Sequence, residues 1–321
     1  MMMTSALVFP GQGSQAAGMG KALAAHFKAA RDVFDEVDAA LGEKLSHVMF
    51  EGPEATLTLT ANAQPALMAS SIAVLRVLQS ECGFDLAKSA KFVAGHSLGE
   101  YSALAAAGSI SLSDTARLLR IRGNAMQKAV PAGEGAMAAI IGLDFAAVNA
   151  VATEAARELY LTGAICEAAN DNGGGQVVIS GTKAAVEKAM ELAKARGAKR
   201  AVLLPVSAPF HCSLMTPAAD AMREALAKVS ISAPLVPLIA NVTAAPISDP
   251  DDIRKRLVEQ VTGTVRWRES VAYLASQGVT NFLELGTGKV LAGLVKRIAE
   301  GVTATSISSP DDIAAFKASH A

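Results

Sequence analysis

The stretch "KFVAGHSLGEYSALAAAG", residues 91–108, constrains the fold more than any other part of the chain. An apolar run ends in a glycine-rich turn, and a second apolar run follows at helical spacing, which predicts a strand, a tight turn and a helix. The turn reads G-H-S-L-G, with Ser97 between the two glycines. In this G-x-S-x-G pattern a crowded turn lifts a serine hydroxyl out of a sheet, where it can act as a nucleophile. The alternative is a glycine-rich turn that carries an incidental serine.

Segments typical of strands and of helices alternate in both halves of the chain. This order predicts an α/β fold, in which a mainly parallel sheet covered by helices forms a hydrolase-like core. We expect strands at 6–9, 91–97, 235–241 and 281–285, and helices at 20–40, 63–81, 98–108, 111–130, 217–228, 250–261, 267–277 and, as the last helix, 289–299.

The middle of the chain follows a different order. We expect, in sequence, a strand at 136–142, a helix at 145–159, strands at 164–169 and 176–180, a helix at 182–196 and a strand at 199–205. The order β-α-β-β-α-β is that of a ferredoxin-like α+β unit. We therefore expect a large α/β hydrolase-like domain made of residues 1–132 and 204–321, and an inserted small ferredoxin-like domain of residues 133–203.

Charge and composition exclude several classes of function. A formal net charge of -1 provides no basic field for nucleic acid or an anionic membrane. The 3 cysteines are scattered without a C-x-x-C pair, so we expect reduced thiols and no metal site. No uncharged apolar run reaches the roughly 18 residues of a spanning helix, and the first residues lack the basic region of a secretory signal. We expect a cytoplasmic, monomeric protein that needs neither a metal nor a cofactor.

A serine nucleophile needs a base, and the chain has 5 histidines. His26 and His320 fall in an early helix and in the C-terminal tail, where both are expected to be solvated. His47 has no other reactive residue type nearby, and His96 directly precedes the serine on a turn where neighbouring side chains diverge. His211 lies in "SAPFHCS", a loop after the inserted unit returns to the main sheet, and functional residues concentrate in such loops. By elimination, His211 is the expected base.

One arginine points into the apolar face of the helix expected at 111–130. At about 100° per residue, Leu118, Leu119 and Met126 all fall within about 60° of Arg122. A buried guanidinium without a carboxylate partner would be costly. The partner is either a buried Asp or Glu of the protein or a carboxylate of a substrate, and spacing alone does not separate the two.

Two other glycine-rich stretches do not fit nucleotide-binding motifs. In "GQGSQAAG", Ala16 occupies the third glycine position of the dinucleotide fingerprint, and "GTGKV" lacks the upstream glycine and the Ser/Thr of a P-loop. Gln12 lies in the first of these loops, at the end of an expected strand, where side chains of an α/β sheet face the ligand crevice. As a lone residue, Gln12 also fits an ordinary polar loop position.

Five ordered motifs resemble one enzyme family over essentially the whole chain. They are "FPGQGSQ", "GHSLGEYSAL", "RGNAMQ", "FHCSLM" and "VEQVTGTVRWRESV". Together they are similar to malonyl-CoA:acyl carrier protein transacylases of type II fatty acid synthesis. The resemblance implies catalysis by Ser97 and His211 and binding of the substrate carboxylate by Arg122. It also implies an oxyanion hole formed by the backbone N–H groups of Gln12 and Leu98.

The resemblance implies further positions around this pair. The backbone carbonyl of Gln260 would orient the catalytic histidine in place of an Asp. Asn170 and Asn172 match an asparagine pair near the substrate cleft, and Phe210 resembles the residue found in malonyl-selective members. One departure is the segment "GGGQ" at 173–176, which is more glycine-rich than is usual in the family and lies at the expected thioester entrance.

The implied activity is acyl transfer, with malonyl-CoA and holo acyl carrier protein as partners. Ser97 would attack the thioester while His211 takes its proton, and the phosphopantetheine thiol of the carrier would then attack the malonyl-serine ester. The alternatives are a polyketide-pathway acyltransferase, a serine hydrolase such as a thioesterase or carboxylesterase, and a non-catalytic scaffold that binds carrier protein. An α/β-hydrolase would place its histidine near the end of the chain and would leave Arg122 unexplained. The intact set of nucleophile, base and arginine argues against the scaffold.

Overall fold

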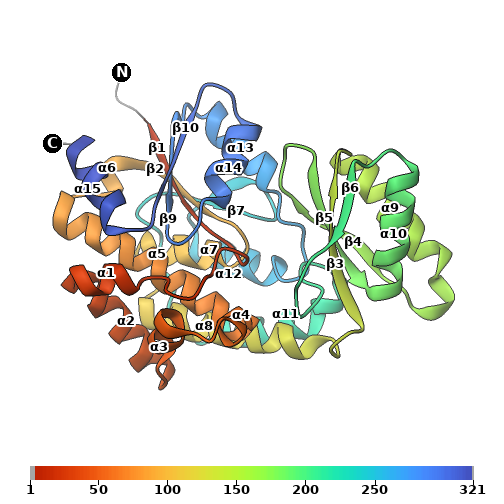
Figure 1. Ribbon diagram of the computed structural model, residues 1–321, viewed down its shortest axis with the longest axis horizontal. Coiled ribbons are helices and arrows are strands. Elements are labelled where there is room, and N and C mark those ends of the chain that lie inside the picture. The colour runs from red at the N-terminus through yellow and green to blue at the C-terminus, as the bar shows by residue number, and fades with distance from the viewer. Residues whose placement is uncertain (1–3, 320–321) are drawn as a thin grey trace.

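The computed structural model describes residues 4–319, which form two β-sheets and the helices around them (Figure 1). Within these residues the larger sheet has 6 strands in the order β10-β9-β1-β2-β7-β8. They are β1 (Ser5–Phe9), β2 (Ala90–Gly95), β7 (Leu238–Ala240), β8 (Ala245–Ile247), β9 (Asn281–Leu285) and β10 (Thr303–Ile307). The pairs are parallel apart from the edge pair of β7 and β8. The predicted mainly parallel sheet is confirmed.

Helices cover both faces of this sheet. On one face lie α13 (Trp267–Ser276) and α14 (Val290–Ile298). The other face carries the larger core, to which the remaining helices of this part contribute: α1 (Lys21–His26), α2 (Lys28–Leu41), α3 (Leu45–Glu51), α4 (Glu54–Thr58), α5 (Thr60–Cys82), α6 (Leu86–Ser89), α7 (Gly99–Ala106), α8 (Leu112–Ala129), α11 (Thr216–Leu226), α12 (Pro250–Glu259) and α15 (Pro310–Ser319). Among the described helices, none combines the length and apolar character needed to span a membrane.

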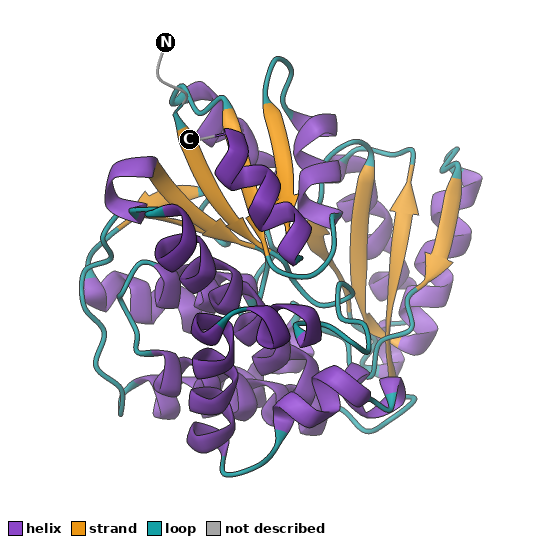
Figure 2. Ribbon diagram, turned by 60° about the vertical axis from the view of Figure 1, so that its left-hand side comes forward, coloured by secondary structure: helices purple, strands orange, loops and turns teal. Residues whose placement is uncertain are grey.

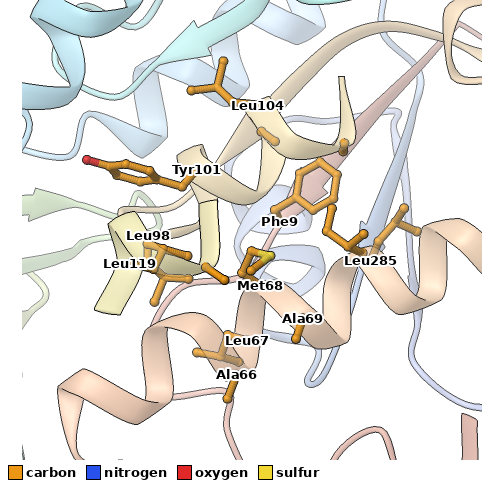
Figure 3. Packing of buried hydrophobic residues seen from close by; sticks show 14 of the residues in the cluster. Phe9, Ala66, Leu67, Met68, Ala69, Leu98, Tyr101, Leu104, Leu119 and Leu285 are labelled. Atoms are coloured by element: carbon orange, nitrogen blue, oxygen red, sulfur yellow. The ribbon is translucent and has the colours of Figure 1, made fainter. Parts of the chain in front are cut away.

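The side chains of β1 alternate between the two cores. Leu7 and Phe9 pack into the larger core, while Ala6 and Val8 pack on the opposite face against the core that includes α13 and α14. A strand buried on both faces carries apolar side chains on both, which is why residues 6–9 of this strand form a continuous apolar run in the sequence. Figure 3 shows the larger core, where Phe9 lies near side chains of α5 such as Met68.

The second sheet has the order β4-β5-β3-β6, and its neighbouring strands are antiparallel. Its strands are β3 (Gly135–Ile141), β4 (Cys166–Asp171), β5 (Gln176–Thr182) and β6 (Arg200–Leu203). Helices α9 (Phe145–Glu158) and α10 (Lys183–Ala195) pack on its outer face, at the right of Figure 1, and the short 3-10 helix η1 (Tyr160–Thr162) follows α9. The element order along the chain is the predicted β-α-β-β-α-β.

The inner face of the second sheet turns toward the larger sheet and its helices. On β3, Ala138 and Ile140 pack against α9 and α10, whereas Met137 and Ala139 belong to the core of the larger part. The two groups of strands are seen together in Figure 2. A cleft between them can therefore be lined by side chains from both sheets.

Some predicted elements were wrong in extent or number. The helix expected at 20–40 is two helices, because Phe27 is extended (φ -124°, ψ 124°) between α1 and α2. The strand expected at 235–241 spans only Leu238–Ala240, since the proline before it has no N–H for the ladder. The helix expected at 289–299 is not the last, because β10 and α15 follow it.

Candidate active site

The turn after β2 gives Ser97 an unusual backbone. Its φ is 54°, in the left-handed region that non-glycine residues rarely adopt. A Cβ at Gly95 would lie 1.9 Å from the carbonyl carbon of Gly99, and a Cβ at Gly99 would lie 2.2 Å from the carbonyl oxygen of Phe9. Both glycines of the motif are therefore required by close backbone approach, and the strand-turn-helix geometry presents the serine at the carboxyl end of the sheet.

Asn241 holds this strained turn in place. It follows β7, the neighbour of β2, and is buried. Its side-chain oxygen accepts a hydrogen bond from the Ser97 N–H at 2.8 Å, and its Nδ2 donates to the Gly95 carbonyl at 2.7 Å. These bonds offset a strained conformation that costs on the order of 1–3 kcal/mol. Asn241 was not among the residues predicted from the sequence, although its position at the end of an expected strand was an available signal.

Ser97 and His211 form a hydrogen-bonded pair. Ser97 Oγ lies 2.7 Å from His211 Nε2, and His211 Nδ1 lies 2.9 Å from the backbone carbonyl of Gln260. A carbonyl can only accept, so Nδ1 carries the proton and Nε2 is the free acceptor for the serine hydroxyl. Burial, and then the nearby charge of Arg122, lower the pKa of His211 to about 3. The imidazole is therefore neutral and can accept a proton.

Arg122 points into the same site from α8. As predicted, Leu118, Leu119 and Met126 share its buried face. Its Nη1 donates to Gln64 Oε1 at 2.8 Å; its Nη2 donates to Gln260 Oε1 at 2.8 Å and to Ser97 Oγ at 3.1 Å. Among residues 4–319, its hydrogen-bond partners are amide and hydroxyl oxygens rather than a carboxylate, and its Nε has none. Within the described part of the chain, no carboxylate bonds directly to this buried cation.

These side chains line a cavity of about 510 Å³. Eight of the nine predicted site residues contribute to its wall: Gln12, Ser97, Leu98, Arg122, Asn170, Asn172, Phe210 and His211. The ninth, Gln260, is fully buried behind the wall and reaches Arg122 with its side chain. Met137 and Val178, from the second sheet, belong to the apolar part of the wall. The cavity therefore has a polar end at the serine and an apolar side that could pack against an acyl or pantetheine chain.

Other predicted residues take defined places around this polar end. Gln12 donates from Nε2 to Thr60 Oγ1 at 3.1 Å, which fixes the loop after β1. His96 turns to Asn172, with 2.9 Å between its Nε2 and the Asn172 Oδ1, and its ring lies 5.7 Å from that of Trp267. The expectation that His96 diverges from the serine is confirmed.

Two further histidines of the described residues, His26 and His47, lie away from the serine. His26 is exposed at the end of α1, where its Nδ1 lies 2.8 Å from the Ala22 carbonyl, and His47 is exposed on α3. His320 lies outside the described residues. Within residues 4–319, no group of three His, Cys, Asp or Glu side chains is placed to hold a metal ion.

The glycine-rich segment at the rim of the cavity forms the turn between β4 and β5. Gly173, Gly174 and Gly175 all have positive φ, at 73°, 58° and 73°. The turn ends at Gln176, which lines the cavity. The extra glycines thus shape this rim through the backbone, and the side chain that faces the cavity comes after them.

The sequence also shows to which family this site belongs. The acyl transferase domain family matches residues 6–309. The chain belongs to this family. This acyl transferase is 49% identical to the malonyl CoA-acyl carrier protein transacylase of Bacillus subtilis (strain 168). The alignment spans 308 residues and covers 96% of this chain and 94% of that protein. The resemblance predicted from the five motifs is confirmed.

Solved structures agree with this assignment. The acyl transferase superposes on an acyl-carrier-protein-S-malonyltransferase from Bartonella henselae with a TM-score of 0.95 and 58% identity, covering 99% of each chain. It also superposes on a malonyl-transacylase solved in complex with its type II PKS acyl-carrier protein, with a TM-score of 0.93 and 42% identity over 98% of this chain and 99% of that chain.

Proposed function

We propose that the protein transfers a malonyl group from malonyl-CoA to the phosphopantetheine thiol of acyl carrier protein through an ester on Ser97. One observation carries the proposal: Ser97 Oγ is 2.7 Å from His211 Nε2 and 3.1 Å from Arg122 Nη2. A base and a cation thus meet at one hydroxyl. In a malonyl group, a single methylene separates the thioester carbonyl from the carboxylate. An acyl group of this shape can present its carbonyl to the serine and its carboxylate to the guanidinium together.

In the first step, Ser97 Oγ attacks the thioester carbonyl while His211 Nε2 takes the hydroxyl proton. The backbone N–H groups of Gln12 and Leu98 hold the oxyanion. The C–S bond then breaks, and the coenzyme A sulfur leaves as a thiol with the proton from His211. The hydrogen bond from Nδ1 to the Gln260 carbonyl keeps the imidazole oriented through both proton transfers.

In the second step, the phosphopantetheine thiol of the carrier loses its proton to His211 and attacks the malonyl ester. The C–O bond to Ser97 breaks, and the proton returns from His211 to the serine oxygen. Both steps are acyl substitutions with proton transfer, so the protein's own side chains supply the chemistry without a metal or cofactor.

Residues around the pair set selectivity. Phe210, which lines the cavity beside the base, crowds any α-methyl group on the acyl chain. Asn170 and Asn172 border the thioester, and Asn172 also fixes His96.

We place the enzyme in the cytoplasm, as a monomer. The second sheet and its helices (133–203) form an inserted domain, and 1–132 with 204–321 form the large domain.

The pathway that we propose is fatty acid chain elongation. A second candidate is polyketide synthesis, and the complex of a structural relative with a type II PKS acyl-carrier protein favours it. Malonyl transfer to each purified holo carrier protein would separate the two, because the physiological carrier should give the higher kcat/KM.

The experiment that tests the function measures where the malonyl group goes. Purified protein is incubated with malonyl-CoA, with and without holo acyl carrier protein, and its intact mass is measured by mass spectrometry. The proposal expects one malonyl adduct that persists in water and moves to the carrier when it is added. Rapid release of free malonate would instead identify a hydrolase, and the absence of any adduct would identify a scaffold.

A further inference from the structure

Glu100 is a buried carboxyl group that the two steps above do not use. It lies in the first turn of α7, directly after the elbow, and is completely buried. Its Oε2 accepts hydrogen bonds from Gln260 Nε2 at 2.7 Å and from the Asn241 backbone N–H at 3.2 Å. Burial raises the pKa of Glu100 to about 7, and the bonds from Gln260 and Asn241, with the charge of Arg122, oppose this rise. Burying a carboxyl group away from water is energetically unfavourable, so its presence beside the active site indicates a function there.

The Gln260 carboxamide joins Glu100 to Arg122. Its Nε2 donates both to Glu100 Oε2 and, at 2.9 Å, to the Ser97 carbonyl, while its Oε1 accepts from Arg122 Nη2 at 2.8 Å. An amide has one donating end and one accepting end, and a guanidinium can only donate. The reverse orientation would put the amide oxygen against two acceptors and the NH2 group against the guanidinium. Glu100 and the Ser97 carbonyl therefore both favour the orientation that gives Arg122 an acceptor, and Glu100 is the side chain of the two.

We infer that Glu100 is a positioning residue for the acyl carboxylate: it orients the Gln260 carboxamide, which in turn holds Arg122 Nη2 beside the Ser97 hydroxyl. The inference rests on the proposed function, because it takes Arg122 as the group that binds the malonyl carboxylate. Glu100 is not among the residues that line the cavity, so it acts through Gln260 and not by contact with substrate.

Two substitutions at Glu100 separate hydrogen bonding from charge. Both Glu100→Gln and Glu100→Leu remove the ionisable carboxyl group, but glutamine can place its amide oxygen where Oε2 accepts its two bonds. We expect Glu100→Leu to lower the malonyl-to-acetyl ratio of kcat/KM by about tenfold or more. Glu100→Gln should keep the ratio within about threefold of the parent. Equal losses in both variants would overturn the hydrogen-bond assignment.

A matched control removes a buried carboxyl group elsewhere. Asp38, on α2, is buried and accepts hydrogen bonds from the N–H and the hydroxyl of Ser46. Asp38→Ala should lower the melting temperature and leave the malonyl-to-acetyl ratio unchanged. If its ratio falls as far as that of Glu100→Leu, the effect is one of general destabilisation and the inference is wrong.

A double-mutant cycle tests the route through the amide. Gln260→Leu alone should lower the malonyl-to-acetyl ratio, and adding Glu100→Leu should lower it no further. Gln260→Leu also tests the inference if Glu100→Leu fails to fold, because an unchanged ratio in that variant would overturn it. Arg122→Ala is measured in parallel: an unchanged ratio there refutes the proposed function. A collapsed ratio in Arg122→Ala beside parental ratios in Glu100→Leu and Gln260→Leu refutes only the role of Glu100.

Discussion

Replacing Arg122 by alanine separates a structural arginine from one that binds substrate. Loss of one partner of a buried ion pair costs about 3–5 kcal/mol of stability. Here the guanidinium bonds to the amide oxygens of Gln64 and Gln260, at the wall of a cavity that water can enter. The substitution leaves these two neutral amide oxygens without their donor, whereas breaking an ion pair would leave a charged carboxylate unpaired. We therefore expect the free energy of unfolding to fall by only about 1–2 kcal/mol.

The catalytic effect of Arg122→Ala should be much larger. Hydrogen bonds to charged groups contribute about 1.5–3 kcal/mol, which corresponds to a fall of about 10- to 150-fold in kcat/KM for malonyl-CoA. Acetyl-CoA carries no carboxylate, so its transfer should change far less and the malonyl-to-acetyl ratio should collapse. The assay compares kcat/KM for both thioesters with a thermal melt of the same preparations.

Arg120→Ala is the matched control on the same helix. Arg120 is an arginine with a true ion pair, to Glu43, and it also donates to the Ala61 carbonyl at 2.7 Å. It is not among the residues that line the cavity, so its loss should lower stability and leave the ratio unchanged. A large drop in melting temperature for Arg122→Ala with an unchanged ratio would refute the substrate-binding role.

Three further predictions concern the base and the turn. His211→Asn, chosen because asparagine tolerates the φ of 59° at this position, should slow single-turnover acylation by a factor of about 100 or more; a parental rate would exclude His211 as the base. Because the base must be neutral and burial lowers the pKa of His211 to about 3, acylation should continue as the pH falls through about 6.5 and should decline only as the pH approaches 3; a pH profile with its midpoint near 6.5 would contradict this. Gly99→Ala should destabilise the protein by about 1–3 kcal/mol in urea unfolding, because its Cβ would lie 2.2 Å from the Phe9 carbonyl oxygen; Gly293→Ala, where nothing lies within 4 Å, should stabilise it by up to about 1 kcal/mol, and equal effects would refute the packing argument.

Features encoded by neighbouring residues could be predicted from the sequence. The elbow is such a feature, because its strand, glycines and helix follow one another directly in the chain. The inward direction of Arg122 also follows from local periodicity on one helix. By contrast, β10 was missed because it is an edge strand whose buried positions, Ala304 and Ile307, do not form an apolar run.

Contacts across long stretches of chain could not be worked out in this way. Ser97 and His211 are 114 positions apart, and only elimination and the resemblance paired them. The sequence predicted a carboxylate partner for Arg122 in the protein or in the substrate. The amide oxygens of Gln64 and Gln260 were not foreseen, because they are brought to the guanidinium by the packing of three separate parts of the chain.

Ser97 as the residue that carries the acyl group is the most direct point to test. The protein is treated with malonyl-CoA, quenched in acid, digested and mapped by mass spectrometry, in parallel with Ser97→Ala. We predict a malonyl group on the peptide that contains Ser97, lost at the rate at which malonyl-carrier protein appears when holo carrier is added. Ser97→Ala should melt close to the parent and carry no adduct. A malonyl group on another residue, or malonyl-carrier protein formed by Ser97→Ala at the parental rate, would contradict a malonyl-serine intermediate at Ser97.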